Sequence, residues 1–446
     1  MVVNVETPRT AGRAARPRAR ALGAVLVLVL TLAALAGCGS STYQASPAAH
    51  VSAAAATVNV SSGCSEAVLT TLSSVAQRVY HEGVLSERTA SAEYLITSST
   101  ALRAAVESGS RAAARTAARA LLATGHLTNV TVMRGSKTLV DVGGPALAPL
   151  HGTLTGAGGA PIGSYVASVW ADEGFLTEAG GITQGLVALR AGEHSLDGSP
   201  SLGTAVLADT GSLTRAGIAY RYTSFPAIAY PSGAVRVYVL APTSTIAPLC
   251  GRTPQDTMVD TLERVAKLIY TGEIGRTAQM QLRRMQRNTP LLEAVAHREP
   301  EAARLAIDAL LDQHVVRIRV TVGGALLEDV GGPYVLGPIS APLRQHGHTI
   351  ATVTLSIQDD EGYLRLARRL AGLDVLMYMS PNSAHPQLVK NSLSKGPGPA
   401  LDTVPASGPY KYLGHSYQVF TVHAQAFPSG PLTIRVLVPI PYPSNG

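Results

Sequence analysis

Two arginines in the second half of this 446-residue chain, Arg317 and Arg319, have the type and spacing of a binding pair. They alternate with Val316, Ile318 and Val320, so a strand here directs the guanidinium groups to one face and the apolar side chains to the other. A guanidinium group binds a carboxylate through two parallel hydrogen bonds. The pattern therefore predicts a site for a small anion on the polar face of this strand.

Three side chains on later predicted strands extend this candidate site: Tyr378, Tyr417 and His423. Arginine, tyrosine and histidine together suit a carboxylate or a similar anion. The alternative is that these side chains are solvated on an open face. The anion hypothesis also requires that neither Glu328 nor Asp329 neutralises the guanidinium groups.

One tetrapeptide could indicate catalysis. Ser392-x-x-Lys395 matches the nucleophile motif of penicillin-binding enzymes, in which the lysine takes the proton of the serine. It lies in the stretch 380–409, which is rich in Pro, Gly and Ser, and the sequence holds neither an SDN nor a KTG partner motif. We therefore expect no enzyme activity.

Two further motifs could hold a metal ion. His346-x-His348 offers two imidazoles, but no third ligand completes the set in sequence. The acidic run 359–361 could bind calcium, and the alternative is a turn that caps a helix beginning near Gly362. We expect neither a metal site nor a cofactor.

The duplicated motif Asp-Val-Gly-Gly-Pro, at 141–145 and 329–333, belongs to a repeat with an offset near 190 residues. Leu72-x-x-Val-Ala-x-x-Val-Tyr likewise recurs at Leu262 as Leu-x-x-Val-Ala-x-x-Ile-Tyr. Asp-Glu-Gly-Phe at 172–175 recurs as Asp-Glu-Gly-Tyr at 360–363. These matches keep their order, so the body of the chain is a tandem repeat.

Each repeat follows the same plan, in which helices precede strands. Helical periodicity covers about 64–124 and 255–313, and alternating strand patterns follow each of these regions. This order predicts an α+β fold, with an antiparallel sheet in each repeat and a long N-terminal helix packed on one face. We expect the two modules to cover 64–241 and 255–441.

This succession of helices, strand, glycine turn, D-V-G-G-P, D-[DE]-G-[FY] and G-L-x-x-L resembles the Cache (PAS-like) extracytoplasmic sensor domain. The resemblance covers both repeats and implies that loops over the sheet face away from the long helix enclose a small ligand. Asn129 and Thr131, which lack charge, replace the arginine pair in the first repeat, so we expect the second repeat to bind the ligand.

The N-terminus resembles a bacterial lipoprotein signal peptide. Arginines between residues 9 and 20 precede an apolar run, 21–36, that ends in the box Leu-Ala-Gly-Cys at Cys38. About 16 residues are short for the ~20 that span a bilayer, although an uncleaved anchor with a chance cysteine is the alternative. We expect residues 1–37 to be removed and Cys38 to carry acyl chains such as palmitate. Residues 38–63 then form a flexible tether at the extracytoplasmic face of the cell membrane.

The net charge of +7 does not indicate a nucleic-acid partner. The signal peptide carries +4 of it, and the remaining 31 basic and 28 acidic side chains nearly balance. The leading hypothesis is a lipid-anchored sensory protein that captures a small anionic molecule. The alternative is a non-catalytic interaction or scaffold lipoprotein with degenerate pockets, whose partner is a membrane receptor or another envelope protein. In that case the loop 380–412 is a candidate partner surface.

Two cysteines remain once Cys38 is lipidated, namely Cys64 and Cys250. Each precedes the first helix of its repeat, and an exported protein meets oxidising conditions. Their even number and their matching positions in the two repeats predict a disulfide that joins the repeats, with two free thiols as the alternative.

Overall fold

The computed structural model describes residues 61–443, which belong to one compact unit, 57–446. The residues that it does not describe within this range are 125, 273, 312–314, 334, 381–385, 394–397 and 428–429. The predicted signal peptide, Cys38 and all but the last residues of the tether also lie outside the described residues. No helix in the described part of the chain is long and apolar enough to span a membrane.

Repeat 1 begins with a run of four helices, and a fifth lies between its strands: α1 (Ser62–Leu85), α2 (Glu87–Ser98), α3 (Thr100–Ser108), α4 (Arg111–Leu122) and α5 (Asp172–Thr183). A serine precedes each of the first four helices, at positions 61, 86, 99 and 110. Its hydroxyl accepts a hydrogen bond from the backbone N–H three residues on. Each hydroxyl satisfies an N–H that would otherwise lack a partner, so these serines fix where the helices start.

The strands of repeat 1 are β1 (Asn129–Arg134), β2 (Lys137–Gly143), β3 (Ala146–Leu147), β4 (Leu150–Thr155), β5 (Pro161–Ser168), β6 (Trp170–Ala171), β7 (Leu186–Ala191), β8 (His194–Ser195), β9 (Thr210–Arg215), β10 (Ile218–Tyr230) and β11 (Gly233–Pro242). They form a small sheet of order β2-β1-β5-β4. A large sheet has the order β6-β3-β10-β11-β7-β8, with β9 paired to β10. The short segments α6 (Thr243–Ile246) and η1 (Ala247–Leu249) lead into repeat 2.

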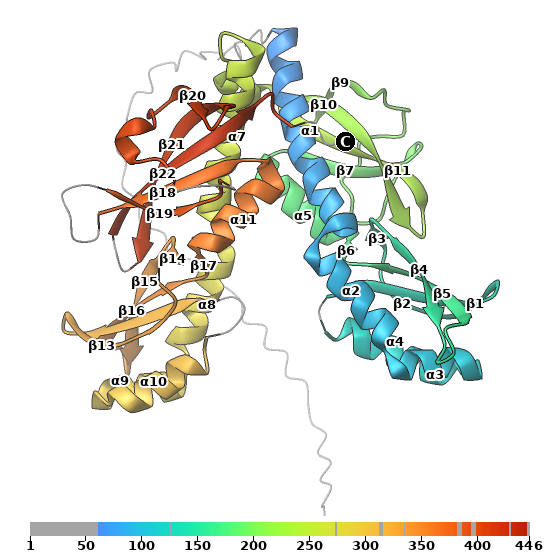
Figure 1. Ribbon diagram of the computed structural model, residues 1–446, viewed down its shortest axis with the longest axis horizontal. Coiled ribbons are helices and arrows are strands. Elements are labelled where there is room, and N and C mark those ends of the chain that lie inside the picture. The colour runs from blue at the N-terminus through green and yellow to red at the C-terminus, as the bar shows by residue number, and fades with distance from the viewer. Residues whose placement is uncertain are drawn as a thin grey trace, which may run out of the picture. The chain divides into compact units, whose positions relative to one another are not determined.

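Repeat 2 contains helices α7 (Pro254–Gly272), α8 (Arg276–Gln286), α9 (Thr289–His297), α10 (Pro300–Asp308), η2 (Leu401–Thr403) and α11 (Asp360–Ala371). Its strands are β12 (Arg317–Val322), β13 (Ala325–Gly331), β14 (Val335–Leu336), β15 (Ile339–Gln345), β16 (His348–Ser356), β17 (Gln358–Asp359), β18 (Asp374–Met379), β19 (Gln387–Asn391), β20 (Gly408–Tyr412), β21 (His415–Phe427) and β22 (Gly430–Ile440). The sheet orders are β13-β12-β16-β15 and β17-β14-β21-β22-β18-β19, with β20 paired to β21. Position for position, this is the strand order of repeat 1 (Figure 1).

The α+β class and the duplication are therefore present, but each repeat contains two sheets where the sequence predicted one. The chain leaves the small sheet at the D-V-G-G-P motif, because β2 ends at Gly143 and β13 ends at Gly331. Both glycines have positive φ, 108° and 133°. A Cβ at either one would lie 2.3 Å from a backbone carbonyl oxygen. Only glycine fits this bend, which carries the chain into the large sheet.

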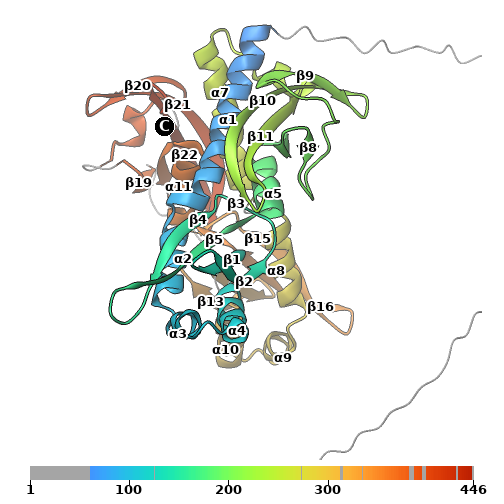
Figure 2. The ribbon, with the colours of Figure 1, turned by 90° about the vertical axis from the view of Figure 1, so that its right-hand side faces the viewer.

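Each small sheet packs on the three short helices of its own repeat. In repeat 2, Ile318 and Val320 are fully buried in a cluster with side chains of α8, α9 and α10, as their alternation predicted. The corresponding cluster in repeat 1 joins α2, α3 and α4 to β1 and β5. The ribbon in Figure 2 shows α3, α4, α9 and α10 at the end of the body away from β9 and β10.

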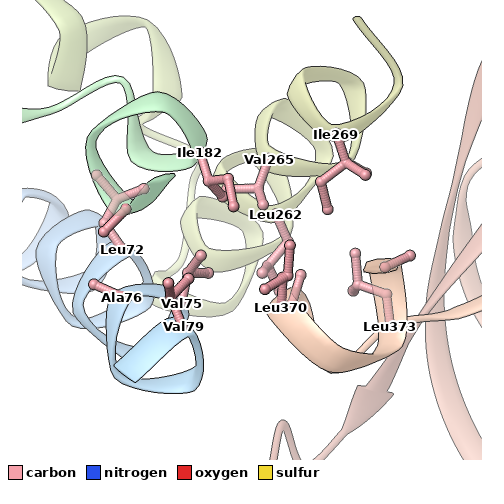
Figure 3. Packing of buried hydrophobic residues seen from close by; sticks show 14 of the residues in the cluster. Leu72, Val75, Ala76, Val79, Ile182, Leu262, Val265, Ile269, Leu370 and Leu373 are labelled. Atoms are coloured by element: carbon pink, nitrogen blue, oxygen red, sulfur yellow. The ribbon is translucent and has the colours of Figure 1, made fainter. Parts of the chain in front are cut away.

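The long helices α1 and α7 pack against each other, and a single apolar core continues across both repeats. Leu72, Val75, Ala76 and Val79 of α1 and their α7 equivalents, spaced three and four residues apart, are all buried in it. Figure 3 shows them meeting Ile182 of α5 and Leu370 of α11. The two repeats are thus halves of one folded body.

The predicted disulfide between Cys64 and Cys250 is present, with a Cα–Cα distance of 5.5 Å. This value lies within the usual disulfide range of about 4.4–6.8 Å. The bridge joins residues 186 positions apart and ties the first turn of α1 to the segment that precedes α7.

We predict that replacing both Cys64 and Cys250 by Ser lowers the free energy of unfolding by about 2–5 kcal/mol, because the unfolded chain loses a long-range constraint. The shared core keeps the variant folded, so urea unfolding followed by circular dichroism measures the change. Reduced wild-type protein is the control and should match the variant. Equal stability of the oxidised wild type and the variant would contradict the prediction.

Candidate functional site

Asp329 on β13 holds both predicted arginines of β12. Its Oδ1 accepts a hydrogen bond from Nε of Arg317 at 2.8 Å, and its Oδ2 accepts one from Nη2 of Arg317 at 2.9 Å. Arg319 donates from Nε at 2.8 Å and from Nη2 at 2.5 Å to the same Oδ2. Nη1 of Arg317 also donates to the carbonyl oxygen of Gly332 at 2.7 Å. An internal carboxylate therefore occupies the donors that an anionic ligand would need.

Phe427, at the end of β21 in the large sheet, covers the same guanidinium groups. Its ring centroid lies 5.2 Å from Cζ of Arg317 and 4.4 Å from Cζ of Arg319, within the range of cation–π contacts. The side chains of Arg317 and Arg319 are only 14% and 29% exposed. The expectation that these arginines face an anion site is corrected here, because Asp329 binds both guanidinium groups and Phe427 covers them.

Repeat 1 builds the same contact from different residues. Asp141, the equivalent of Asp329, accepts hydrogen bonds from the hydroxyl of Thr131 at 2.8 Å and from that of Tyr230 at 3.0 Å. The hydroxyl oxygens of Thr131 and Tyr230 also lie 2.9 Å apart. Tyr230 lies at the end of β10, as Phe427 lies at the end of β21. We call this arrangement the inter-sheet clasp, because the aspartate of each D-V-G-G-P motif connects the small sheet to the large one.

The electrostatics of the clasp in repeat 2 favour an ionised Asp329. Burial of the carboxyl opposes ionisation, but the hydrogen bonds and charges of Arg317 and Arg319 outweigh it and lower the pKa of Asp329. With one carboxylate shared by two guanidinium groups, the clasp keeps a net positive charge, spread over side chains with protein partners.

The other predicted site residues do not gather around the arginines. Tyr378 is fully buried on the outer face of the large sheet, where its hydroxyl donates to the carbonyl oxygen of Pro399 at 2.8 Å. Tyr417 is buried in the same apolar cluster, together with Val404 from the covering loop. His423 lies further along β21 and is exposed. Among the described residues, apolar side chains of the sheet and of the covering loop pack together on this face.

The short motifs have structural roles where they are described. The hydroxyl of Ser392 accepts a hydrogen bond from the backbone N–H of Val375 at 2.7 Å and donates to Asp374 at 3.1 Å, while Lys395 lies outside the described residues. Asp359 caps α11 by accepting from the backbone N–H of Gly362 at 2.7 Å, so the alternative to a calcium site is supported.

His346 and His348 are exposed at a hairpin between β15 and β16. Among the described residues, no group of three or more His, Cys, Asp or Glu side chains is placed to hold a metal ion.

Sequence reasoning missed a group of charged side chains between the repeats. Arg369 of α11 forms an ion pair with Glu82 of α1, whose side chain is 10% exposed. Burial raises the pKa of Glu82 to about 7. The positive charge of Arg369 opposes this shift, and the negative charge of Glu178 on α5 adds to it. Comparison of the two repeats could have drawn attention to these residues. Glu82 of repeat 1 aligns with Gly272 of repeat 2, and Arg369 of repeat 2 aligns with Gly181 of repeat 1, so each repeat has one charged side chain where the other has glycine.

Comparison with known proteins does not identify a family. No protein-family model matches the sequence, and no curated protein matches it. The solved ligand-binding domain of the Pseudomonas fluorescens chemoreceptor CtaA, in complex with L-isoleucine, is similar over 40% of this chain and 95% of its own. The identity is 11% and the TM-score 0.23.

An extracellular ligand-binding receptor from Desulfohalobium retbaense DSM5692 is similar over 51% of this chain and 47% of its own, with 11% identity and a TM-score of 0.21. These TM-scores are too low for either likeness to support a conclusion about this chain. The resemblance to Cache domains accordingly stays a prediction.

We predict that Asp329→Ala destabilises the protein by about 2–3 kcal/mol at pH 7, because it leaves two half-buried guanidinium groups without their acceptor. Urea unfolding measures the loss. The matched control is the triple variant Arg317→Asn, Arg319→Thr and Phe427→Tyr, which introduces the clasp of repeat 1 and should retain most of the stability. A triple variant as unstable as Asp329→Ala would argue against the clasp.

The same clasp predicts a pH dependence. Since the folded-state pKa of Asp329 is lowered, its contribution to stability is present above the unfolded pKa of about 3.9 and is lost as the pH falls through the folded pKa. The stability difference between wild type and Asp329→Ala should therefore shrink in acid. A difference that stays constant down to pH 2 would show that ionisation of Asp329 plays no part.

Proposed function

We propose that this protein is a non-catalytic interaction protein of the cell envelope, held at the extracytoplasmic face of the membrane by acyl chains on Cys38. Its two repeats present binding surfaces in a fixed mutual arrangement to a membrane receptor or another envelope protein. The proposal adopts the second of the two hypotheses raised by the sequence.

The observation that carries this proposal is the single apolar core that joins the repeats. Helices α1 and α7 are buried against each other, and the disulfide between Cys64 and Cys250 ties the helices near their starts. A body joined in this way resists independent movement of its halves, which suits a protein that displays surfaces rather than one that transmits a change between two domains. The satisfied clasps and the filled outer sheet face of repeat 2 also favour interaction over ligand capture at those places.

A second candidate function, capture of a small molecule, is favoured by a different observation. A hollow of about 420 Å³ lies between α5, α7 and α11, outside the predicted anion site. Its volume falls within the range of small-molecule sites. This candidate keeps the sensory hypothesis but moves the ligand from the individual repeat to the junction between the repeats.

We predict that Cys38→Ser moves the protein from the membrane fraction to the soluble fraction, because the acyl chains are its anchor. Fractionation of cells that produce wild type or variant measures the change, with Cys64→Ser as a control that leaves the anchor intact. A Cys38→Ser variant that stays membrane-bound and uncleaved would contradict the lipoprotein hypothesis.

Native electrophoresis of gentle detergent extracts tests the interaction itself. Wild-type protein should migrate as part of an assembly larger than its own monomer, and the assembly should depend on Cys38. A wild-type protein that runs only as a monomer would reject the interaction function and leave capture of a small molecule as the remaining candidate.

A further inference from the structure

The hollow between α5, α7 and α11 has an apolar floor and is open to solvent. Ile182 of α5, Ile269 of α7 and Leu370 of α11 are buried at its base, and all three are labelled in Figure 3. Ile357 and Leu366 complete this floor. A ligand that removes an apolar surface of this kind from water makes the free energy of binding more favourable.

Because the chain is duplicated, the hollow has an equivalent position between α11, α1 and α5. Long charged side chains occupy the corresponding residues at that position. Arg369 and Glu82, which form an ion pair, are the equivalents of Gly181 and Gly272 in the hollow. Arg78 is the equivalent of Leu268, and its guanidinium lies 5.8 Å from the ring of Tyr442. Equivalent helix positions therefore carry glycines beside the hollow and an ion pair of long charged side chains at the other junction.

The two glycines leave the hollow open without being required by the backbone. Neither has a positive φ, and a Cβ at Gly181 or Gly272 would meet no atom within 4 Å. Since a Cβ fits at both positions, the backbone does not require glycine there.

One carboxylate, that of Glu178 on α5, lines the hollow. Within the described part of the chain it forms no hydrogen bond or ion pair, and the nearby Arg369 is engaged with Glu82. Glu178 is exposed at the hollow, but the protein around it still raises the pKa of its carboxyl by desolvation, while the charge of Arg369 opposes this shift. The residue nevertheless remains accessible to solvent, so a ligand can reach it.

From this arrangement we infer that the hollow binds a small amphipathic amine, whose apolar skeleton lies on the isoleucine and leucine floor and whose ammonium group pairs with Glu178. A carboxylate without an internal partner beside an apolar surface is best complemented by a cation that carries its own apolar part. This inference rests on the second candidate function, capture of a small molecule.

The test uses the full-length protein in detergent at pH 8, where an alkylammonium group remains charged. The probe is 2-phenylethylamine, and 2-phenylethanol and 3-phenylpropanoate are controls with similar skeletons. Thermal shift and calorimetry should detect dose-dependent binding of the amine, at least about tenfold tighter than either control.

Two variants connect binding to the hollow. The double variant Gly181→Arg with Gly272→Glu copies the ion pair of the equivalent place and should abolish the thermal shift. Glu178→Gln should weaken binding of the amine by about tenfold or more, while binding of the alcohol is unaffected. Gly158→Arg, at a surface turn where a Cβ also meets no atom within 4 Å, is the control for an added arginine and should bind as wild type does.

Any of three results would overturn the inference. They are no binding of the amine by wild type at 10 mM, about the same Kd for all three probes, and an unchanged thermal shift in the folded double variant. If the double variant does not fold, Glu178→Gln and the three-probe comparison decide alone. Failure of these experiments leaves the membrane location and the larger assembly untouched, so the inference and the interaction function fail independently.

Discussion

Helices α1 and α7 each carry an apolar stripe that packs both on strands of its own repeat and on helices of the other. The equivalent residues Val75 and Val265 are fully buried in the same core. Burial of one such side chain contributes roughly 1.5–3 kcal/mol, and a repeat standing alone would expose part of its stripe to water. Each repeat consequently depends on the other. The disulfide strengthens this dependence, and the identical strand orders follow from two copies of one sequence that share a single core.

The inter-sheet clasp applies a similar constraint inside each repeat. At Gly143 and Gly331 the chain bends out of the small sheet, and the aspartate two residues earlier reaches an aromatic side chain of the large sheet directly or through arginine. In repeat 1 the aspartate binds hydroxyl groups, and in repeat 2 it binds guanidinium groups. The chemistry of the partners differs while the connection is kept. A motif present in both repeats thus has a structural role, although its residue types suggested a binding site.

The elements were predictable because their signals are local. Alternation and a Gly-Gly turn located β12 and β13, and helical periodicity located α1 and α7. The pairing of Arg319 was not predictable, since the two-residue turn at Gly323-Gly324 alone would place Glu328 opposite it. A bulge between Val320 and Thr321 shifts the register by one residue and brings Asp329 there instead. The number of sheets was missed for a related reason, because strand pairing depends on contacts between distant segments.

The junction between the repeats shows why equivalent backbones need not have equivalent functions. Side chains of α5 and α7 are packed in the shared core beside the space that Gly181 and Gly272 line. On the other side, the same helix positions carry Arg369 and Glu82, which form an ion pair. A cavity that packing elsewhere holds open needs no rearrangement before it binds, which lowers the free-energy cost of binding. Fusion of the repeats thus allows one junction to serve stability while the other remains available to a ligand.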